Sequence, residues 1–237
     1  MHAMSTPDQE IEIKLDCPRH KVEAFLEHPI LHALDGHHRP ERHKMVNIYY
    51  DTPDLLLRKS KVALRLRRID HEWVQTLKAP GRREGGLSTR KEWEMKVAGE
   101  ALELDRFDGT DAEGIIKALR EHGMEAQLAP LFRVDFERMA WMLRPYPRTL
   151  PTFRTEVVLD RGEILAGGRR QAVSEIEIEL KRGHVKELVR VADMLKRDIG
   201  LSEETASKAR RGYALLALNA ADQKAADQKA AAAAAAP

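Results

Sequence analysis

The sequence predicts an α+β fold in which a closed β-barrel has a charged lumen and amphipathic helices pack outside it. The first observation is strict alternation of charged and apolar residues, as in Glu10-Ile11-Glu12-Ile13-Lys14 and again over 175–181. Alternate side chains of a strand share one face, so such strands have one charged and one apolar face. The second is a set of amphipathic helices, which need an apolar surface to cover. A barrel with inward charges provides that surface, whereas a β-sandwich with a wet exterior is the alternative.

Length and composition bound the class of protein. The 237 residues, 43% of them hydrophobic, suffice for a real core. Lys+Arg 40 against Asp+Glu 38 leave a net charge of +2, which lacks the basic excess of a general nucleic-acid binder. The single Cys17 excludes an internal disulfide, and no apolar run is long enough for a membrane span. We therefore expect a cytoplasmic protein with no nucleic-acid or membrane partner.

The elements follow from alternation, helical spacing and turn residues. Asp70-His71 predicts a tight hairpin, and Ala166-Gly167-Gly168 predicts another turn. Helices are predicted at 19–27, 112–122, 184–197 and 203–218, the third from apolar residues at helical spacing. Strands are predicted near 9–16, 44–51, 61–69, 72–78, 88–97, 131–139, 153–160 and 171–181, with a further short one at 162–166.

The chain divides into one domain and a tail. Residues 8–219 contain no break in composition, and the expected barrel domain covers residues 1–219. Residues 220–237 repeat Ala-Asp-Gln-Lys-Ala at 221–225 and 226–230 and continue as an alanine run. This composition is typical of a semi-rigid helical spacer, or of an expression remnant, and we assign it no site.

The charged strand faces predict a site for a polyanion and hard cations. Many ionised groups in one lumen are costly unless they pair with each other or meet ligands. Arginine and lysine donate to phosphate oxygens, and carboxylates supply the oxygen ligands that Mg²⁺ or Mn²⁺ prefers. On 131–139 we expect Arg133 and Asp135 to face inward, opposite Phe132, Val134 and Phe136. The basic residues of the predicted inner faces are Arg65, Arg67, Lys78, Arg90, Arg133 and Arg154.

Eight motifs in order resemble those of the CYTH superfamily, the triphosphate tunnel metalloenzymes. The resemblance spans about residues 9 to 215 and is most similar to the bacterial inorganic triphosphatases, some of which carry a C-terminal helical polyphosphate-binding domain. It implies a closed eight-stranded antiparallel β-barrel that forms a tunnel and hydrolyses triphosphates with a divalent metal. The motifs are Glu10-x-Glu12-x-Lys14, Tyr49-Tyr50-Asp51-Thr52-Pro53, Ala63-Leu64-Arg65-Leu66-Arg67, Thr76-Leu77-Lys78, Arg90-x-Glu92-Trp93-Glu94, Asp160-Arg161-Gly162, Glu175-x-Glu177 and Ser207-Lys208.

The resemblance also implies roles for matched residues. Lys14 is implied either in phosphate contact or in tuning of the neighbouring glutamates. Glu92, Glu94 and Glu179 are implied either as metal ligands or as pairing partners in the lumen, and Arg154 and Glu156 as a mutual pair. The implied metal ligands are Glu10, Glu12, Asp160, Glu175 and Glu177; the implied substrate-binding residues are Lys14, Arg65, Arg67, Lys78, Arg90, Arg133 and Lys208; the implied catalytic residues are Glu10, Glu12, Lys14 and Glu177.

Three functions are compatible with these motifs. The first is metal-dependent hydrolysis of inorganic tripolyphosphate to pyrophosphate and phosphate; the second is chemistry on an organic triphosphate, as by a thiamine triphosphatase or a class IV adenylate cyclase; the third is a non-catalytic polyphosphate-binding module. Recognition of an organic group commonly uses stacking aromatics, but Trp73 and Trp93 fall on apolar faces, which leaves Trp141 and the tyrosines. Every acidic motif position is occupied, which favours catalysis. A C-terminal polyphosphate-binding domain outside this chain would suit the spacer.

Overall fold

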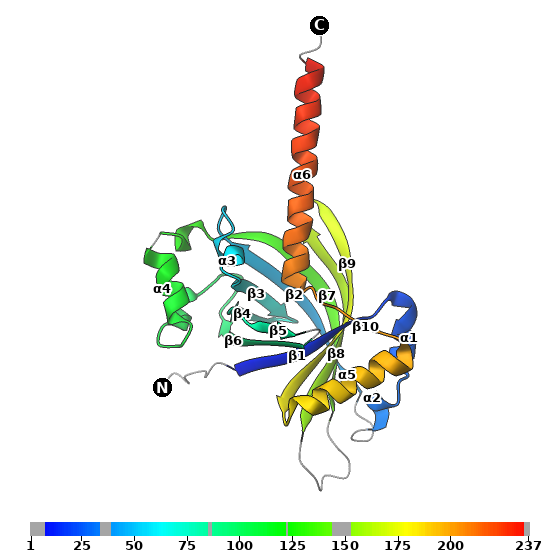
Figure 1. Ribbon diagram of the computed structural model, residues 1–237. Helices are drawn as coiled ribbons and strands as arrows, with labels where there is room; N and C mark the ends of the chain where they lie inside the picture. Colours follow the sequence, from blue (N-terminus) through cyan, green and yellow to red (C-terminus); the bar gives the residue numbers. More distant parts are fainter. Residues whose placement is uncertain (1–7, 34–38, 85–86, 122, 144–152, 235–237) are drawn as a thin grey trace.

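Eight antiparallel strands close into a barrel (Figure 1). The computed structural model describes residues 8–33, 39–84, 87–121, 123–143 and 153–234. Neighbouring strands follow the order β1-β9-β8-β7-β2-β3-β4-β6, and pairing of β6 with β1 closes the ring. The predicted barrel is therefore confirmed. Its strands are β1 (Asp8–Asp16), β2 (Glu41–Asp51), β3 (Ala63–Ile69), β4 (Glu72–Lys78), β6 (Leu87–Val97), β7 (Ala129–Leu143), β8 (Arg154–Ala166) and β9 (Arg169–Arg182), and two short strands, β5 (Arg82–Glu84) and β10 (Ser202–Glu203), extend the sheet.

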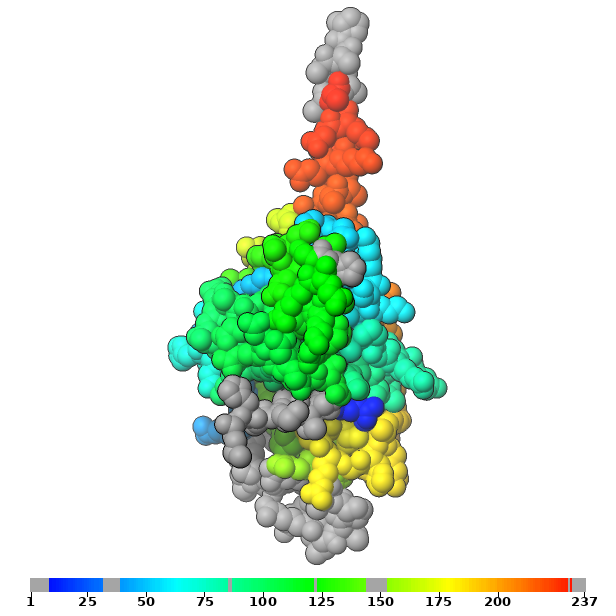
Figure 2. All heavy atoms as spheres, turned by 90° about the vertical axis from the view of Figure 1, so that its left-hand side faces the viewer, coloured from blue at the N-terminus to red at the C-terminus, as the bar shows by residue number. Residues whose placement is uncertain are grey.

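Five α-helices lie outside the barrel, as expected of helices with one apolar face. The helix α5 packs against β1 and β9 around a core that includes Leu15, Ile176 and Leu195. The segment that contains α4 covers β3, β4 and β6 around Trp93 and Ile116, and Figure 2 shows it as a continuous green layer on that face. The outer helices are α1 (Val22–Leu26), α2 (Ile30–Ala33), α3 (Leu56–Lys59), α4 (Glu113–Glu121) and α5 (Val185–Ile199), and 3₁₀ turns lie at Arg19–Lys21, Leu104–Phe107 and Glu125–Gln127. No helix within the described ranges combines the length and apolarity that a bilayer span requires.

Alternation along β1 sorts the side chains between lumen and core as predicted. Glu12 and Lys14 are buried within the barrel, whereas Ile13 and Leu15 join the core beneath α5. On β9, paired with β1, Ile176 and Ile178 join the same core. Because one strand presents both faces, the same residues build the tunnel wall and the layer that supports it.

In the first part of β7 the apolar side chains face inward and the charged ones outward, so the predicted inward orientation of Arg133 and Asp135 is wrong. Phe132 lies opposite Tyr49 of β2 in the register, and the two rings stack with centroids 4.7 Å apart. Tyr49 lines the lumen, so Phe132 and the other even-numbered residues of β7 face inward. Arg133 therefore points outward with 49% of its side chain exposed, and its Nε donates to Asp135 Oδ1 at 2.5 Å.

The helix α6 (Lys208–Ala234) accounts for this apolar end. Its first turns pack against the inner face of β7, β8 and β9 through Tyr213 and Leu215. Gly212 permits the approach, because a Cβ there would lie 2.2 Å from the Phe132 ring. We predicted this helix over 203–218. It begins later, at a cap in which Ser207 Oγ accepts from the Arg210 amide at 3.2 Å, and it continues away from the barrel (Figure 1).

Several predicted boundaries differ from the structure for reasons that alternation cannot reveal. The two strands predicted at 153–160 and 162–166 are one strand, β8, because Gly162 continues the ladder opposite Phe136. A side chain at 162 would collide with the backbone of β7, since a Cβ would lie 2.0 Å from the Asp135 carbonyl oxygen. Gly162 thus allows β7 and β8 to pair over their full length.

We predict that Gly162→Ala destabilises the fold by about 1–3 kcal/mol, because the added methyl meets backbone rather than a flexible side chain. The matched control is Gly114→Ala, where nothing lies within 4 Å of the new Cβ and alanine is the better residue for a helix. Urea unfolding followed by circular dichroism measures both. Equal midpoints for Gly162→Ala and the parent protein would contradict the close approach.

Candidate active site

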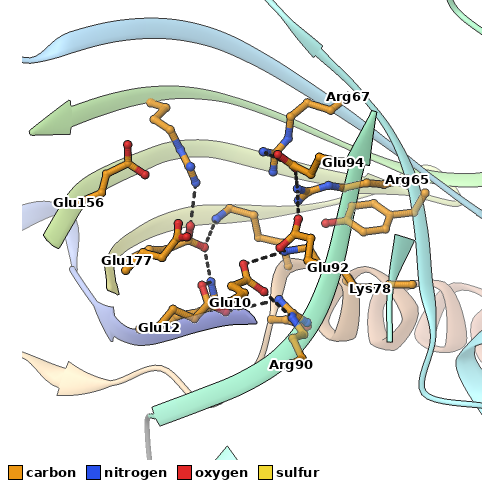
Figure 3. Close-up of a pocket in the computed structure, with 18 of the residues that line it drawn as sticks. Glu10, Glu12, Arg65, Arg67, Lys78, Arg90, Glu92, Glu94, Glu156 and Glu177 are labelled. Carbon is orange, nitrogen blue, oxygen red and sulfur yellow. Dashed lines mark hydrogen bonds and ion pairs between the residues drawn. The ribbon is translucent and has the colours of Figure 1, made fainter. Parts of the chain in front are cut away.

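The barrel encloses a cavity of about 300 Å³ lined almost entirely by ionisable side chains (Figure 3). Half of the basic groups come from β3, β4 and β6, whereas β1, β8 and β9 contribute most of the carboxylates. The seven lining carboxylates are Glu10, Glu12, Glu92, Glu94, Glu156, Glu177 and Glu179, and the eight lining cations are Lys14, Arg65, Arg67, Lys78, Arg90, Arg138, Lys181 and Lys208.

Most of the sequence-predicted residues meet in this cavity. Asp160 and Glu175 lie beside it, fully buried against Lys208. Arg133 does not reach it, because its side chain is on the outer surface, and we remove it from the candidate site. The predicted residues that line the cavity are Glu10, Glu12, Lys14, Arg65, Arg67, Lys78, Arg90, Glu177 and Lys208.

Glu92 links the cations of the basic side. Lys78 Nζ donates to Glu92 Oε2 at 2.7 Å, and Arg65 Nη2 donates to Glu92 Oε1 at 3.2 Å. Burial raises the pKa of the Glu92 carboxyl, and the adjacent Glu10 adds to this effect, so that the pKa reaches about 7 in spite of Lys78. Glu92 therefore exchanges its proton near neutral pH and changes the charge of the basic side.

Arg67 is the least neutralised of the buried cations. Its Nε donates to the side-chain oxygen of Asn47 at 2.9 Å, and its Nη1 lies 3.8 Å from Glu94 Oε1. Burial, Arg65 and Arg138 lower the pKa of Arg67 to about 10. A buried guanidinium held among other cations creates a positive potential, which an anion would relieve.

The acidic side is held together by Lys14 and Arg90. Lys14 Nζ donates to Glu12 Oε2 at 2.8 Å and also to Glu177, and Figure 3 shows Glu12 of β1 and Glu177 of β9 lying close together in the cavity. Arg90 Nε donates to Glu10 Oε2 at 2.6 Å. Burial acts to raise the pKa of Glu10, but Lys78 and Arg90 outweigh it and hold that pKa below its ordinary value. Glu10 is therefore ionised at neutral pH.

Glu10, Glu12 and Glu177 fit a divalent metal. They present carboxylate oxygens to the open cavity, which are the ligands that Mg²⁺ and Mn²⁺ prefer. Asp160, Glu175 and Glu177 also form a group whose oxygens lie within 4.8 Å of one another.

A protein cation already fills that second group. Lys208 Nζ lies 2.6 Å from Asp160 Oδ2, 2.5 Å from Glu175 Oε1 and 3.0 Å from Glu177 Oε1. Arg138 Nη2 donates to Asp160 Oδ2 at 2.7 Å. Lys208 therefore pairs with Asp160 and Glu175, just as Lys14 pairs with Glu12 and Glu177, and a metal at either carboxylate group would have to displace a lysine.

Some lining residues were not predicted as part of the site. Lys181 lies on the same strand face as Glu177 and Glu179, so the alternation over 175–181 could have predicted that it faces the cavity. Its Nζ lies 2.7 Å from Glu179 and 3.4 Å from Glu156. Arg138 follows inward-facing phenylalanines on β7, and its position could be assigned only once the orientation of that strand was known.

Comparison with known proteins places this geometry in a family. The CYTH domain family matches residues 8–213. The inorganic triphosphatase of Haemophilus influenzae is 37% identical over 171 residues, which cover 71% of this chain and 45% of that protein. The chain therefore spans about half the length of this curated relative.

Solved structures share the fold. A Hippeastrum protein described as an adenylyl cyclase with a dominant triphosphatase activity matches with a TM-score of 0.57 and 18% identity, over 87% of this chain and 94% of that one. A Bacillus halodurans protein described as an adenylate cyclase matches with a TM-score of 0.55 and 17% identity, over 87% and 98%. At this identity the likeness shows the barrel alone. With the match over residues 8–213, it follows that the chain belongs to the CYTH domain family.

Proposed function

We propose that this chain hydrolyses inorganic tripolyphosphate to pyrophosphate and phosphate in the presence of Mg²⁺ or Mn²⁺. The observation that carries the proposal is the under-neutralised guanidinium of Arg67 inside a cavity with acidic groups on its other side. A polyanion would supply the missing negative charge, and divalent cations would satisfy the facing glutamates. The inorganic triphosphatase of Haemophilus influenzae, at 37% identity, supports the same chemistry.

The absence of aromatic platforms in the described cavity wall favours an inorganic substrate over an organic triphosphate. Tyr49 is its sole aromatic lining residue among those described, and its ring is stacked on Phe132. Trp93 and Trp141 are buried in the outer cores. Stacking contributes about 1–3 kcal/mol per base in proteins that bind nucleotides by this means, and nothing comparable faces this cavity among the described residues.

The residues divide the reaction between two sides of the lumen. Phosphoryl transfer needs alignment and charge neutralisation more than covalent chemistry. Arg65, Arg67 and Lys78 bind and align the phosphates from the basic side. Glu10, Glu12 and Glu177 would hold the metal, which would neutralise phosphate charge and lower the pKa of a bound water. A carboxylate of the acidic side accepts the proton of the attacking water.

The setting of the domain is also proposed. We expect a cytoplasmic protein that binds neither nucleic acid nor membrane. We also propose a helical polyphosphate-binding partner domain outside this chain, since the chain spans about half the length of the curated relative.

The first prediction concerns substrate and metal. Tripolyphosphate should be cleaved with marked preference over ATP and thiamine triphosphate, because the lumen binds phosphates and offers no organic group a platform. Release of phosphate and pyrophosphate should be measured for the three substrates with Mg²⁺, with Mn²⁺ and with EDTA. Equal turnover of ATP and tripolyphosphate would refute the proposed substrate, and full activity in EDTA would refute the role of the metal.

The second prediction separates the two sides. Arg67→Ala should weaken metal-free binding of tripolyphosphate roughly tenfold or more, since a hydrogen bond to a charged group contributes on the order of 1.5–3 kcal/mol. Glu12→Gln should abolish turnover while metal-free binding stays equal or tightens, because one repulsive charge is lost. Calorimetry in EDTA measures binding, with the outward-facing Arg133→Ala as control. Identical binding in the Arg67 and Glu12 variants would contradict the two-sided lumen.

The third prediction follows from the raised pKa of Glu92, about 7. Between pH 6 and 8 this carboxyl loses its proton and adds a negative charge beside Lys78 and Arg65, so metal-free affinity for tripolyphosphate should fall. Tripolyphosphate also changes its charge in this pH range. The control is therefore Glu92→Gln, which binds the same titrating ligand but has no titrating carboxyl at position 92. From pH 6 to 8, the parent protein should lose about tenfold more affinity than the variant, the equivalent of one pKa unit. Parallel pH profiles would exclude Glu92 as the titrating group.

A further inference from the structure

We propose that the hydrogen bond between Tyr213 and Asp51 acts as a latch that sets the depth of α6 in the barrel and thereby positions the ammonium of Lys208 in the cavity. The inference rests on the proposed function and adds Tyr213 and Asp51 to it as positioning residues. Neither residue lines the cavity, so each would act through Lys208.

Asp51 is a rigid point of attachment at the end of β2. Its side chain is fully buried, and it accepts hydrogen bonds from the amides of Thr52 at 2.8 Å, Leu57 at 2.8 Å and Arg58 at 3.0 Å. These bonds tie the carboxylate to the chain that enters α3. Because three backbone amides hold the Asp51 carboxylate in place, it restrains the position of a side chain that donates a hydrogen bond to it.

Tyr213 is the partner of Asp51 on α6. Its hydroxyl donates to Asp51 Oδ2 at 2.7 Å. Burial and this hydrogen bond raise the pKa of Tyr213, so the hydroxyl keeps its proton and remains a donor. The ring packs edge-on against Phe132 with centroids 5.1 Å apart, and the guanidinium of Arg58 lies 5.1 Å from its centre. The side chain is therefore held on its hydroxyl, its edge and its face.

Lys208 lies five residues before Tyr213 on the same helix. At a rise of 1.5 Å per residue, about 7.5 Å of helix separates the two positions. The helix runs without interruption from Lys208 to Tyr213, so a shift along its axis moves both residues together. Lys208 lines the cavity and contacts Asp160, Glu175 and Glu177. A misplacement of about 1 Å in a reacting site can cost about 100-fold in rate.

The competing interpretation is that Tyr213 contributes to stability alone. The ion pairs of Lys208, together with Arg211 and Glu175, would then suffice to place the helix. The two interpretations differ in a measurable way: a latch acts on the position of Lys208, whereas general destabilisation acts equally on every buried lysine of the lumen. Lys14, which is buried in the same cavity on β1, provides the reference.

The first test needs no ligand. Full-length Tyr213→Phe should be labelled with an amine-reactive reagent, and the ratio of labelling at Lys208 to labelling at Lys14 followed by mass spectrometry. We expect this ratio to rise about tenfold, because a lost hydrogen bond to a charged group is equivalent to roughly that factor. The matched control is Tyr50→Phe, which also removes a tyrosine hydroxyl. Tyr50 is the neighbour of Asp51 on β2, and it packs against the outer core around Trp93. An unchanged ratio in Tyr213→Phe overturns the proposal.

The second test is a double-mutant cycle on tripolyphosphate turnover, kcat/KM, with Lys208→Met, Tyr213→Phe and both together. If Tyr213 acts through Lys208, Tyr213→Phe should lower kcat/KM about tenfold alone and less than twofold in the Lys208→Met background. If the loss of kcat/KM in the double variant equals the product of the losses in the two single variants, the two residues act independently and the proposal is overturned. If the parent protein shows no turnover, the proposed function fails, and the labelling ratio alone then decides the latch.

Discussion

The need to neutralise ionised groups inside a closed barrel is the constraint on which the rest of the structure depends. A buried charge costs several kcal/mol unless another group compensates it, and here cations and carboxylates from neighbouring strands provide that compensation for each other. Lys14 between Glu12 and Glu177 is the central example. Such pairs keep the lumen folded without a ligand, and they leave donors and acceptors that a polyanion and a divalent cation can take over.

The barrel divides along its axis into a polar part and an apolar part. Strand alternation fixes which residues face inward, but the inward residues change from charged, as at Arg138, to aromatic, as at Phe136 and Phe132, along a single strand. The helix α6 requires this change because its apolar face occupies that end of the barrel. Lys208 lies at the boundary, where the helix delivers one more cation to the polar part.

The fold was largely predictable from the sequence because alternation is a local property. Glu10, Glu12 and Lys14 share a face in any strand, and so do Arg65 and Arg67. Alternation separates two faces but does not say which one is inside, so Arg133 was placed inward on the assumption that charges always face the lumen. Assigning β7 correctly required α6, which contacts it from some 70 residues away along the chain. Asp160 and Glu175 show a second limit, since a carboxylate pattern does not reveal whether a metal or a lysine is its partner.

The closure of the barrel through β1 also determines how the chain can fold. β1 pairs with β6, about 80 residues later, and with β9, more than 160 residues later. During synthesis this strand emerges first, yet its second partner is among the last strands to appear. Contacts so distant in sequence slow folding, because the entropy of closing the loop is lost before the pairing stabilises it. Until β9 arrives, the alternating charges of Glu10, Glu12 and Lys14 keep the edge of β1 polar, which discourages pairing with other chains.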